Sequence, residues 1–205
     1  MKLYWETLSE EVLGLAKSLM TIEGLSAFYL VGGSALSLYL GHRKSVDIDL
    51  FYHEGFNAIE VSEELQKRYK VENLETGNNL VRGTINQIKV DIITHKYRLI
   101  DEVEEQDGIR IVGLKDIAAF KLNAVANRGA KKDFWDIAGL IDKYTLKEMF
   151  GFYEEKYPSF NRWAVEKSLV YFEDADQDTT PLMALNNMTW EEVKRKIRDA
   201  SFLDG

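Results

Sequence analysis

The chain contains no cysteine among its 205 residues. This absence excludes disulfide bonds, thiol nucleophiles and thiolate metal sites, and it is typical of a protein from a reducing compartment. The three histidines, His42, His53 and His95, lie far apart and show no spacing typical of zinc ligands. We therefore expect neither a zinc site nor a cysteine-based active site.

Prolines and long apolar stretches are also scarce. Only Pro158 and Pro181 occur, so no proline-rich linker divides the chain. No apolar run approaches the ~20 residues that a membrane-spanning helix needs. The first 20 residues lack the basic-then-apolar pattern of a signal peptide. We expect a cytoplasmic protein with no membrane partner.

Positive charge is in short supply as well. The chain has 26 Lys and Arg against 34 Asp and Glu, which gives a formal net charge of -8. A globally acidic surface argues against nonspecific coating of nucleic acid, but it leaves room for a local basic site. Hydrophobic residues make up 45% of the chain, so its length and composition predict a folded domain with a full core.

The hydrophobic pattern predicts an α+β fold, with strands and helices in its first half followed by a C-terminal helical region. Residues 1–112 form the predicted α/β core, and residues 113–205 form the predicted helical domain. Thr7 with Glu10, Thr145 with Glu148 and Thr189 with Glu192 have the spacing of capping boxes. The five acidic residues between positions 101 and 107 predict a solvated loop.

Asp47 and Asp49 flank Ile48 in a predicted strand over residues 46–51. Alternate side chains of a strand share a face, so both carboxylates project the same way. Two such carboxylates can hold a hard cation such as Mg²⁺. Taken alone, a solvated strand face explains the pair equally simply, because Asp-x-Asp is a common sequence.

Gly32, Gly33 and Ser34 lie between a predicted strand and a predicted helix. Glycine allows a ligand close to the backbone, and a helix N-terminus offers free amides and a positive dipole to phosphate. The alternative is that Ser34 simply caps the helix. In a later strand, Lys89 and Asp91 share one face, which is either functional or merely exposed.

These elements follow one another in the order strand, Gly-Gly-Ser turn, helix, Asp-x-Asp strand and Asp strand. This layout resembles the nucleotidyltransferase fold of the DNA polymerase β type, which implies a mixed sheet with flanking helices. Four segments are more closely similar to the AbiEii/AbiGii toxin family of nucleotidyltransferases: Tyr29–Phe51 (YLVGGSALSLYLGHRKSVDIDLF), Leu114–Asp136 (LKDIAAFKLNAVANRGAKKDFWD), Leu169–Ala175 (LVYFEDA) and Thr189–Val193 (TWEEV).

The resemblance implies a role for each position that matches a family motif. Gly33 and Ser34 match the phosphate-binding start of the first motif, and Asp47 and Asp49 match its metal-binding aspartates. Lys89 and Asp91 match the second motif, with Asp91 as a third metal ligand. A third motif of lysines followed by Asp-x-x-Asp corresponds to Lys121, to Lys131 or Lys132, and to Asp133 and Asp136.

The third-motif region is also a local reversal of charge. Residues 115–132 carry five positive side chains (Lys115, Lys121, Arg128, Lys131 and Lys132) against one acid, Asp116. Such a patch can hold a triphosphate or a nucleic-acid backbone. Asp133 and Asp136 then orient the lysines or contact the nucleotide; a helix–helix salt-bridge network is the alternative. Arg43 lies either on a basic rim of the phosphate site or in a plain polar loop.

The resemblance implies a Mg²⁺-dependent nucleotidyltransferase that moves NMP from an NTP to a hydroxyl acceptor. Two Mg²⁺ ions are expected at Asp47, Asp49 and Asp91, and Lys121 is expected to neutralise the departing pyrophosphate. The resemblance also implies a toxin of a toxin–antitoxin system, with tRNA among the possible acceptors and an antitoxin protein as partner. The alternatives are a non-catalytic nucleotide-binding module that acts through a partner protein and a transferase that acts on a small molecule.

Overall fold

The computed structural model describes residues 2–159, 161–185 and 187–203. Within these residues, seven strands form one mixed sheet in the order β3-β4-β5-β2-β1-β7-β6. The strands are β1 (Tyr29–Leu30), β2 (Ile48–Tyr52), β3 (Val71–Gly77), β4 (Leu80–Ile85), β5 (Ile88–Thr94), β6 (Glu104–Gln106) and β7 (Ile109–Ile111). The helices are α1 (Glu10–Leu19), α2 (Gly32–Leu40), α3 (Ala58–Arg68), α4 (Leu114–Arg128), α5 (Lys131–Leu140), α6 (Leu146–Lys156), α7 (Arg162–Leu169), α8 (Glu173–Gln177) and α9 (Trp190–Leu203), with short 3-10 turns at Trp5–Thr7 and Glu23–Leu25.

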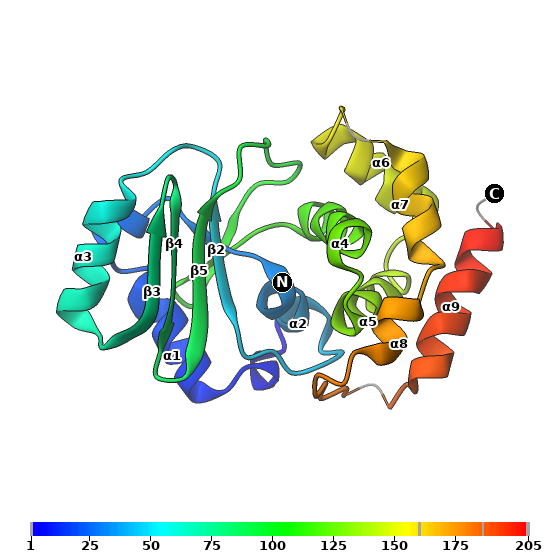
Figure 1. The fold of residues 1–205 in the computed structure, drawn as a ribbon, viewed down its shortest axis with the longest axis horizontal. Helices are drawn as coiled ribbons and strands as arrows, with labels where there is room; N and C mark the ends of the chain where they lie inside the picture. Colours follow the sequence, from blue (N-terminus) through cyan, green and yellow to red (C-terminus); the bar gives the residue numbers. More distant parts are fainter. Residues whose placement is uncertain (1, 160, 186, 204–205) are drawn as a thin grey trace.

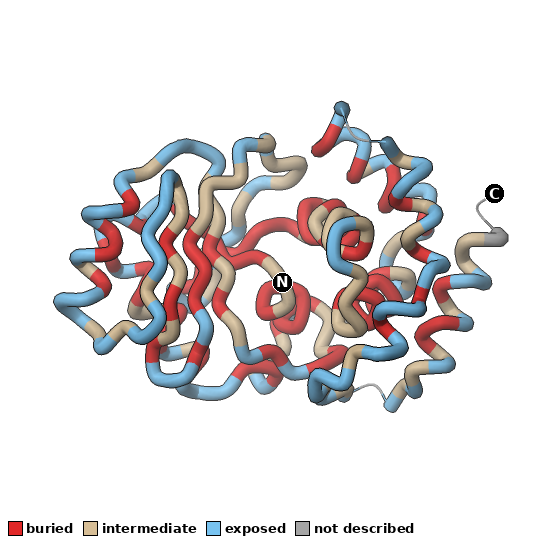
Figure 2. The backbone as a smooth tube through the Cα atoms, in the orientation of Figure 1, coloured by how far each residue is buried: buried red, intermediate tan, exposed pale blue. Residues whose placement is uncertain are grey.

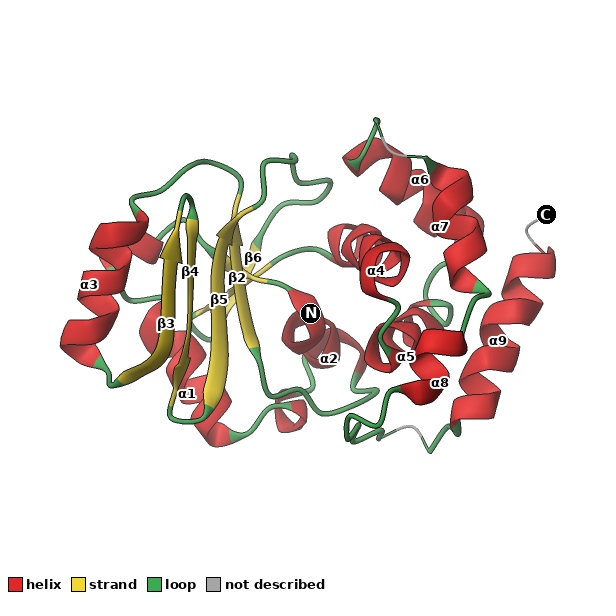
Figure 3. Ribbon diagram, in the orientation of Figure 1, coloured by secondary structure: helices red, strands yellow, loops and turns green. Residues whose placement is uncertain are grey.

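The layers follow from this order. Helices α1 and α3 cover one face of the sheet, and α2 with the helices from α4 onward lies on the other (Figures 1 and 3). Buried segments run along β2 and β5 and continue into α2, α4 and α5 (Figure 2). Residues from both predicted halves belong to one hydrophobic cluster. The α+β prediction is confirmed, and the division at residues 112 and 113 stays a proposal.

The strands β3, β4 and β5 form an antiparallel meander joined by two tight turns. Asn79, Asn86 and Gln87 have positive φ in these turns, a conformation that asparagine tolerates better than most residues. The two-residue turn between β4 and β5 fixes the register and sets Arg82 directly opposite Asp91.

Strand β2 lies between β5, to which it is parallel, and β1, to which it is antiparallel. Ile48 and Leu50 are fully buried, and Asp49 between them projects to the opposite face, toward the start of α2. The alternation in the sequence therefore aims a carboxylate at a helix N-terminus. Between α6 and α4, Lys156 and Asp116 form a buried ion pair of 2.6 Å.

Two local predictions are corrected. Ser9, and not Thr7, caps α1 by accepting a hydrogen bond from the amide of Val12, while the Thr7 hydroxyl donates to the Tyr4 carbonyl. The predicted acidic loop contains the edge strand β6, which pairs with β7. The side chains of an edge strand are exposed, so β6 can be acidic. Its sequence therefore lacks the apolar alternation that would have predicted a strand. The capping box at Thr145 is confirmed, and Thr189 and Glu192 exchange the same reciprocal bonds.

None of the described helices combines the length and apolar content needed to cross a bilayer.

Candidate functional site

A cavity of ≈ 490 Å³ lies where the start of α2 meets β2, β5, α4 and α5. We call it the basic cavity, after the six cationic residues that line it: Arg43, Lys44, Lys89, Lys121, Arg128 and Lys132. Several residues predicted from the sequence line it together: Gly33, Arg43, Asp47, Asp49, Lys89, Asp91, Lys121 and Lys132. The fold thus brings three separate motifs to one place.

The carboxylates of Asp49 and Asp91 occupy register positions on the parallel neighbours β2 and β5. Burial, and then the negative charge of Asp91, raise the pKa of Asp49. Two cations compensate the negative charge of Asp91: the Arg82 Nε donates a hydrogen bond to its carboxylate at 2.9 Å, and the Lys89 Nζ lies 3.2 Å from it. The least compensated negative charge of the site is therefore on Asp49.

Oxygen donors of this kind suit Mg²⁺. Among the residues that the structure describes, however, no three His, Cys, Asp or Glu side chains already form a cation cage. Asp47 is engaged by Lys132, whose Nζ lies 3.4 Å from the carboxylate. The Asp49–Asp91 pair fits a divalent cation, and Asp47 would join it by exchanging its lysine for the metal.

The two glycines at the start of α2 are required by their neighbours. Gly32 has φ +69°, and a Cβ there would collide with the Asp49 carboxylate. A Cβ on Gly33 would collide with the Arg43 guanidinium and crowd the Ser45 hydroxyl. The absence of side chains therefore lets a carboxylate and a guanidinium approach the first turn of α2.

Ser34 does not line the basic cavity, and it does not cap α2, because the N-cap is Val31. Its buried hydroxyl donates to the Asp47 carbonyl and lies 3.0 Å from the Ser45 hydroxyl. Ser34 thereby fixes the loop that leads into β2. A phosphate-binding role for Ser34 stays a prediction.

Two fully buried aspartates on α5 anchor the cations of the cavity. Asp136 accepts hydrogen bonds from the Arg43 Nε at 2.6 Å and Nη2 at 2.9 Å, and its carboxylate lies 2.6 Å from the Lys121 Nζ. Asp133 accepts from the Arg128 Nε at 2.6 Å and from Lys121 at 3.3 Å. Lys121 and Arg128 of α4 thus form a helix–helix salt-bridge network with the two aspartates of α5. A role of Asp133 and Asp136 toward a nucleotide stays a prediction.

These cations control the ionisation of both aspartates. Burial acts to raise the pKa of Asp136, but the positive charges of Arg43 and Lys121 hold that pKa well below its ordinary value. Burial also acts to raise the pKa of Asp133, but its bond to Arg128 and the charges of Lys121 and Arg128 together lower that pKa. Both carboxylates are therefore held as anions beneath the cavity.

Of the two alternative lysines, Lys132 lines the cavity and Lys131 does not. The Lys131 Nζ donates to the Asp178 carbonyl at 2.6 Å and lies over the Trp190 ring. Lys115 also lies away from the site, paired with Asp101. The basic stretch of the sequence is thus divided between the cavity and the outer helices.

Two parts of the site were missed in the sequence. Residues 178–183 form one wall, held by a backbone bond of 2.9 Å from the Lys44 amide to the Met183 carbonyl. Nothing in their composition marks them. Arg82 was missed too, although a two-residue turn at Asn86–Gln87 would have placed it opposite Asp91.

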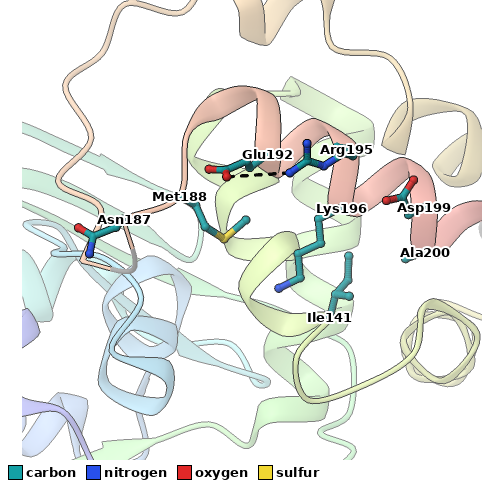
Figure 4. Close-up of a pocket in the computed structure, with 8 residues that line it drawn as sticks. All are labelled: Ile141, Asn187, Met188, Glu192, Arg195, Lys196, Asp199 and Ala200. Carbon is teal, nitrogen blue, oxygen red and sulfur yellow. Dashed lines mark ion pairs between the residues drawn. The ribbon is translucent and has the colours of Figure 1, made fainter.

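A separate hollow lies against α9, where Glu192, Arg195 and Lys196 line it with Ile141 (Figure 4). Arg195 pairs with Glu192 at 3.9 Å, and Lys196 pairs with Asp142 at 2.6 Å. None of the predicted catalytic, nucleotide-binding or metal-binding residues lines it. We therefore place the candidate site at the basic cavity.

The sequence model described as "Nucleotidyl transferase AbiEii toxin, Type IV TA system" matches residues 15–200. The chain belongs to this family. It is 36% identical over 182 residues to the uncharacterized protein aq_aa25 of Aquifex aeolicus, covering 84% of this chain and 87% of that protein. The family resemblance inferred from the sequence is confirmed.

Two solved structures show the same fold. JHP933 from Helicobacter pylori is 20% identical, with a TM-score of 0.56 and coverage of 96% of this chain and 93% of that one. MenT4, the nucleotidyltransferase toxin Rv2826c of Mycobacterium tuberculosis, is 12% identical, with a TM-score of 0.51 and coverage of 91% and 78%. The AbiEii chain is therefore built on a nucleotidyltransferase fold.

Proposed function

We propose that this AbiEii-family chain is a Mg²⁺-dependent enzyme that transfers NMP from an NTP to an acceptor hydroxyl. The observation that carries the proposal is the Asp49–Asp91 pair at the edge of a basic cavity. A carboxylate pair suits a divalent cation, and the neighbouring cations suit polyphosphate. Because the family is one of toxins, we propose a toxin role, with tRNA as the first acceptor to test and an antitoxin protein as partner.

The triphosphate is assigned to the basic cavity. Its negative charge matches Arg43, Lys121 and Lys132, and the first amides of α2 face the same space through Gly32 and Gly33. The buried anions Asp133 and Asp136 fix Arg128, Arg43 and Lys121 in place before any ligand binds. Such preorganised charge stabilises a transition state without reorganisation during the reaction.

In the proposed step, the acceptor hydroxyl oxygen forms a bond to the α-phosphorus. The bond from that phosphorus to the bridging oxygen breaks, and pyrophosphate leaves with the electron pair. Asp91 accepts the hydroxyl proton, while Arg43, Lys121 and Lys132 neutralise the pyrophosphate. Mg²⁺, held by Asp49 and Asp91 with Asp47, would supply further positive charge to the phosphates.

A labelling experiment tests this proposal. Each [α-³²P]NTP is incubated with Mg²⁺, total RNA and cell protein, using wild type, Asp49→Asn and Asp142→Asn. Asp142→Asn is the matched control, since Asp142 pairs with Lys196 outside the site. We expect a discrete labelled band with wild type and with the control, and none with Asp49→Asn.

Undiminished labelling by Asp49→Asn would overturn the assignment of the site. If wild type bound Mg²⁺·NTP but labelled no macromolecule, a transferase for small molecules or a non-catalytic binding module would replace the proposal.

A further inference from the structure

A second cavity of ≈ 340 Å³ adjoins the basic cavity. Five residues line both: Gly32, Asp49, Asp91, Lys121 and Arg128. The two cavities therefore meet at the carboxylate pair. We call the second one the aromatic cavity because Phe51, His95, Phe120 and Tyr157 form much of its wall.

The aromatic wall is an ordered cluster. The rings of Phe51 and His95 are stacked, with centroids 5.3 Å apart and an interplanar angle of 7°. Phe120 meets both rings edge-on, and the Tyr157 hydroxyl lies 3.1 Å from the His95 Nε2. Burial, and then the charge of Lys156, lower the pKa of His95 to about 4, so the imidazole is neutral at pH 7. This wall is aromatic and uncharged.

Two amides on α4 face the same cavity one helical turn apart. The Asn127 Nδ2 donates to the Asn123 carbonyl at 2.8 Å and to the Asn123 Oδ1 at 3.1 Å. Within the part of the chain that the structure describes, no bond engages the Asn123 Nδ2 or the Asn127 Oδ1. One amide donor and one amide acceptor on the lining of this cavity thus remain available to the polar edge of a nucleobase.

The charges of the aromatic cavity favour some ligands over others. Its cations are Arg82, Lys121 and Arg128, and its carboxylates are Asp49 and Asp91. A polycationic acceptor such as an aminoglycoside would bring its ammonium groups against Arg82, Lys121 and Arg128. A planar, uncharged ring that is attached to phosphate meets stacking surfaces, amides and flanking cations.

The geometry of the transfer decides which nucleoside belongs there. In phosphoryl-group displacement, the attacking and leaving oxygens lie roughly in line on opposite sides of the phosphorus. With pyrophosphate leaving into the basic cavity, the acceptor approaches from the side of the aromatic cavity. We propose that the aromatic cavity binds the nucleoside that carries the acceptor hydroxyl, with its base against the aromatic wall and its polar edge on Asn123 and Asn127.

This inference rests on the proposed function, and it assigns the acceptor nucleoside to a cavity beside the carboxylate pair. The test uses calorimetry with the four free ribonucleosides as probes, each titrated in the presence of a saturating α,β-methylene NTP and Mg²⁺. The variants are Asn127→Leu and the matched control Gln66→Leu, an exposed amide on α3. Asn127 is itself exposed, so its replacement is compatible with folding.

We expect at least one nucleoside to bind together with the NTP analogue. Asn127→Leu should weaken that nucleoside by about tenfold, which corresponds to ~1.4 kcal/mol. The control variant should bind it as wild type does.

Three results would overturn the inference: no nucleoside binds although the analogue does, the nucleoside competes with the analogue, or Asn127→Leu has no effect. Failure of the analogue itself to bind would instead refute the proposed function.

Discussion

Replacing Asp136 by asparagine keeps the size of a fully buried side chain and removes its charge. In the wild type this carboxylate receives the Arg43 Nε and Nη2, the Lys121 Nζ and the His42 Nε2 at 2.7 Å. Arg43 and Lys121 are themselves buried. Removing one partner of a buried pair typically costs about 3–5 kcal/mol, because the remaining charge is left uncompensated.

The expected loss is large relative to the total stability of a domain, which is about 5–15 kcal/mol. For a chain of this size, each kcal/mol lowers Tm by roughly 2–4 °C, so we expect a fall of roughly 6–20 °C. Urea unfolding followed by circular dichroism measures the same difference as a lower midpoint. The matched control Asp142→Asn removes an exposed pair and should cost less than about 1 kcal/mol.

The pH dependence gives a second readout of the same substitution. The pKa of Asp136 is lower in the folded chain than in the unfolded chain, where it is near the ordinary value of about 3.9. Its contribution to stability is therefore present above about pH 4 and is lost as the pH falls toward the folded pKa. Asp136→Asn should remove that part of the acid destabilisation. A variant as stable as Asp142→Asn would refute the anchoring role of Asp136.

Three further predictions concern the site and its surroundings. Asp49→Asn should abolish transfer and raise Tm at pH 7, because folding raises the pKa of Asp49 and so disfavours its anion. The gain in Tm should vanish in acid, where the wild-type carboxyl group is protonated. A lowered Tm at pH 7 would contradict this. Gly32→Ala should destabilise the chain and reduce transfer, because the added Cβ displaces Asp49. The control Gly14→Ala in α1 adds a Cβ that meets nothing within 4 Å, and it should stabilise the chain by about 0.5–1 kcal/mol in urea unfolding. Equal effects of the two substitutions would refute the requirement for glycine at position 32. In an NMR titration the His95 ring should remain neutral down to about pH 5, with a pKa of about 4. The folded chain should therefore lose stability as the pH falls from about 6.5 toward 4. A pKa near the ordinary histidine value would contradict the burial of His95.

Much of the architecture was predictable because local patterns agree with the fold. Alternation in β2 and β5 places Asp49 and Asp91 on one face, as the sequence predicts. Gly41 ends α2 in the left-handed conformation that glycine adopts readily. The edge strand β6 was hidden because its exposed residues carry no apolar alternation. Pairing there depends on the neighbouring β7, which is a tertiary effect.

The motifs of the candidate site were predictable from the sequence, but the contacts between their side chains were not. Neither the contact of Gly32 with Asp49 nor the convergence of Arg43 and Lys121 on Asp136 follows from spacing, because each joins distant segments. The aromatic cavity was missed for the same reason. Only the fold places the His95 ring beside Phe51 and Phe120.

The central claim is that the chain transfers a nucleotide at the basic cavity and releases pyrophosphate there. The most direct measurement compares the same NTP labelled with ³²P at the α or the γ position, under identical conditions with Mg²⁺ and RNA. Our account predicts that the α label enters the acceptor while the γ label leaves as pyrophosphate. Incorporation of the γ label would show transfer of the terminal phosphoryl group instead, and it would contradict the account.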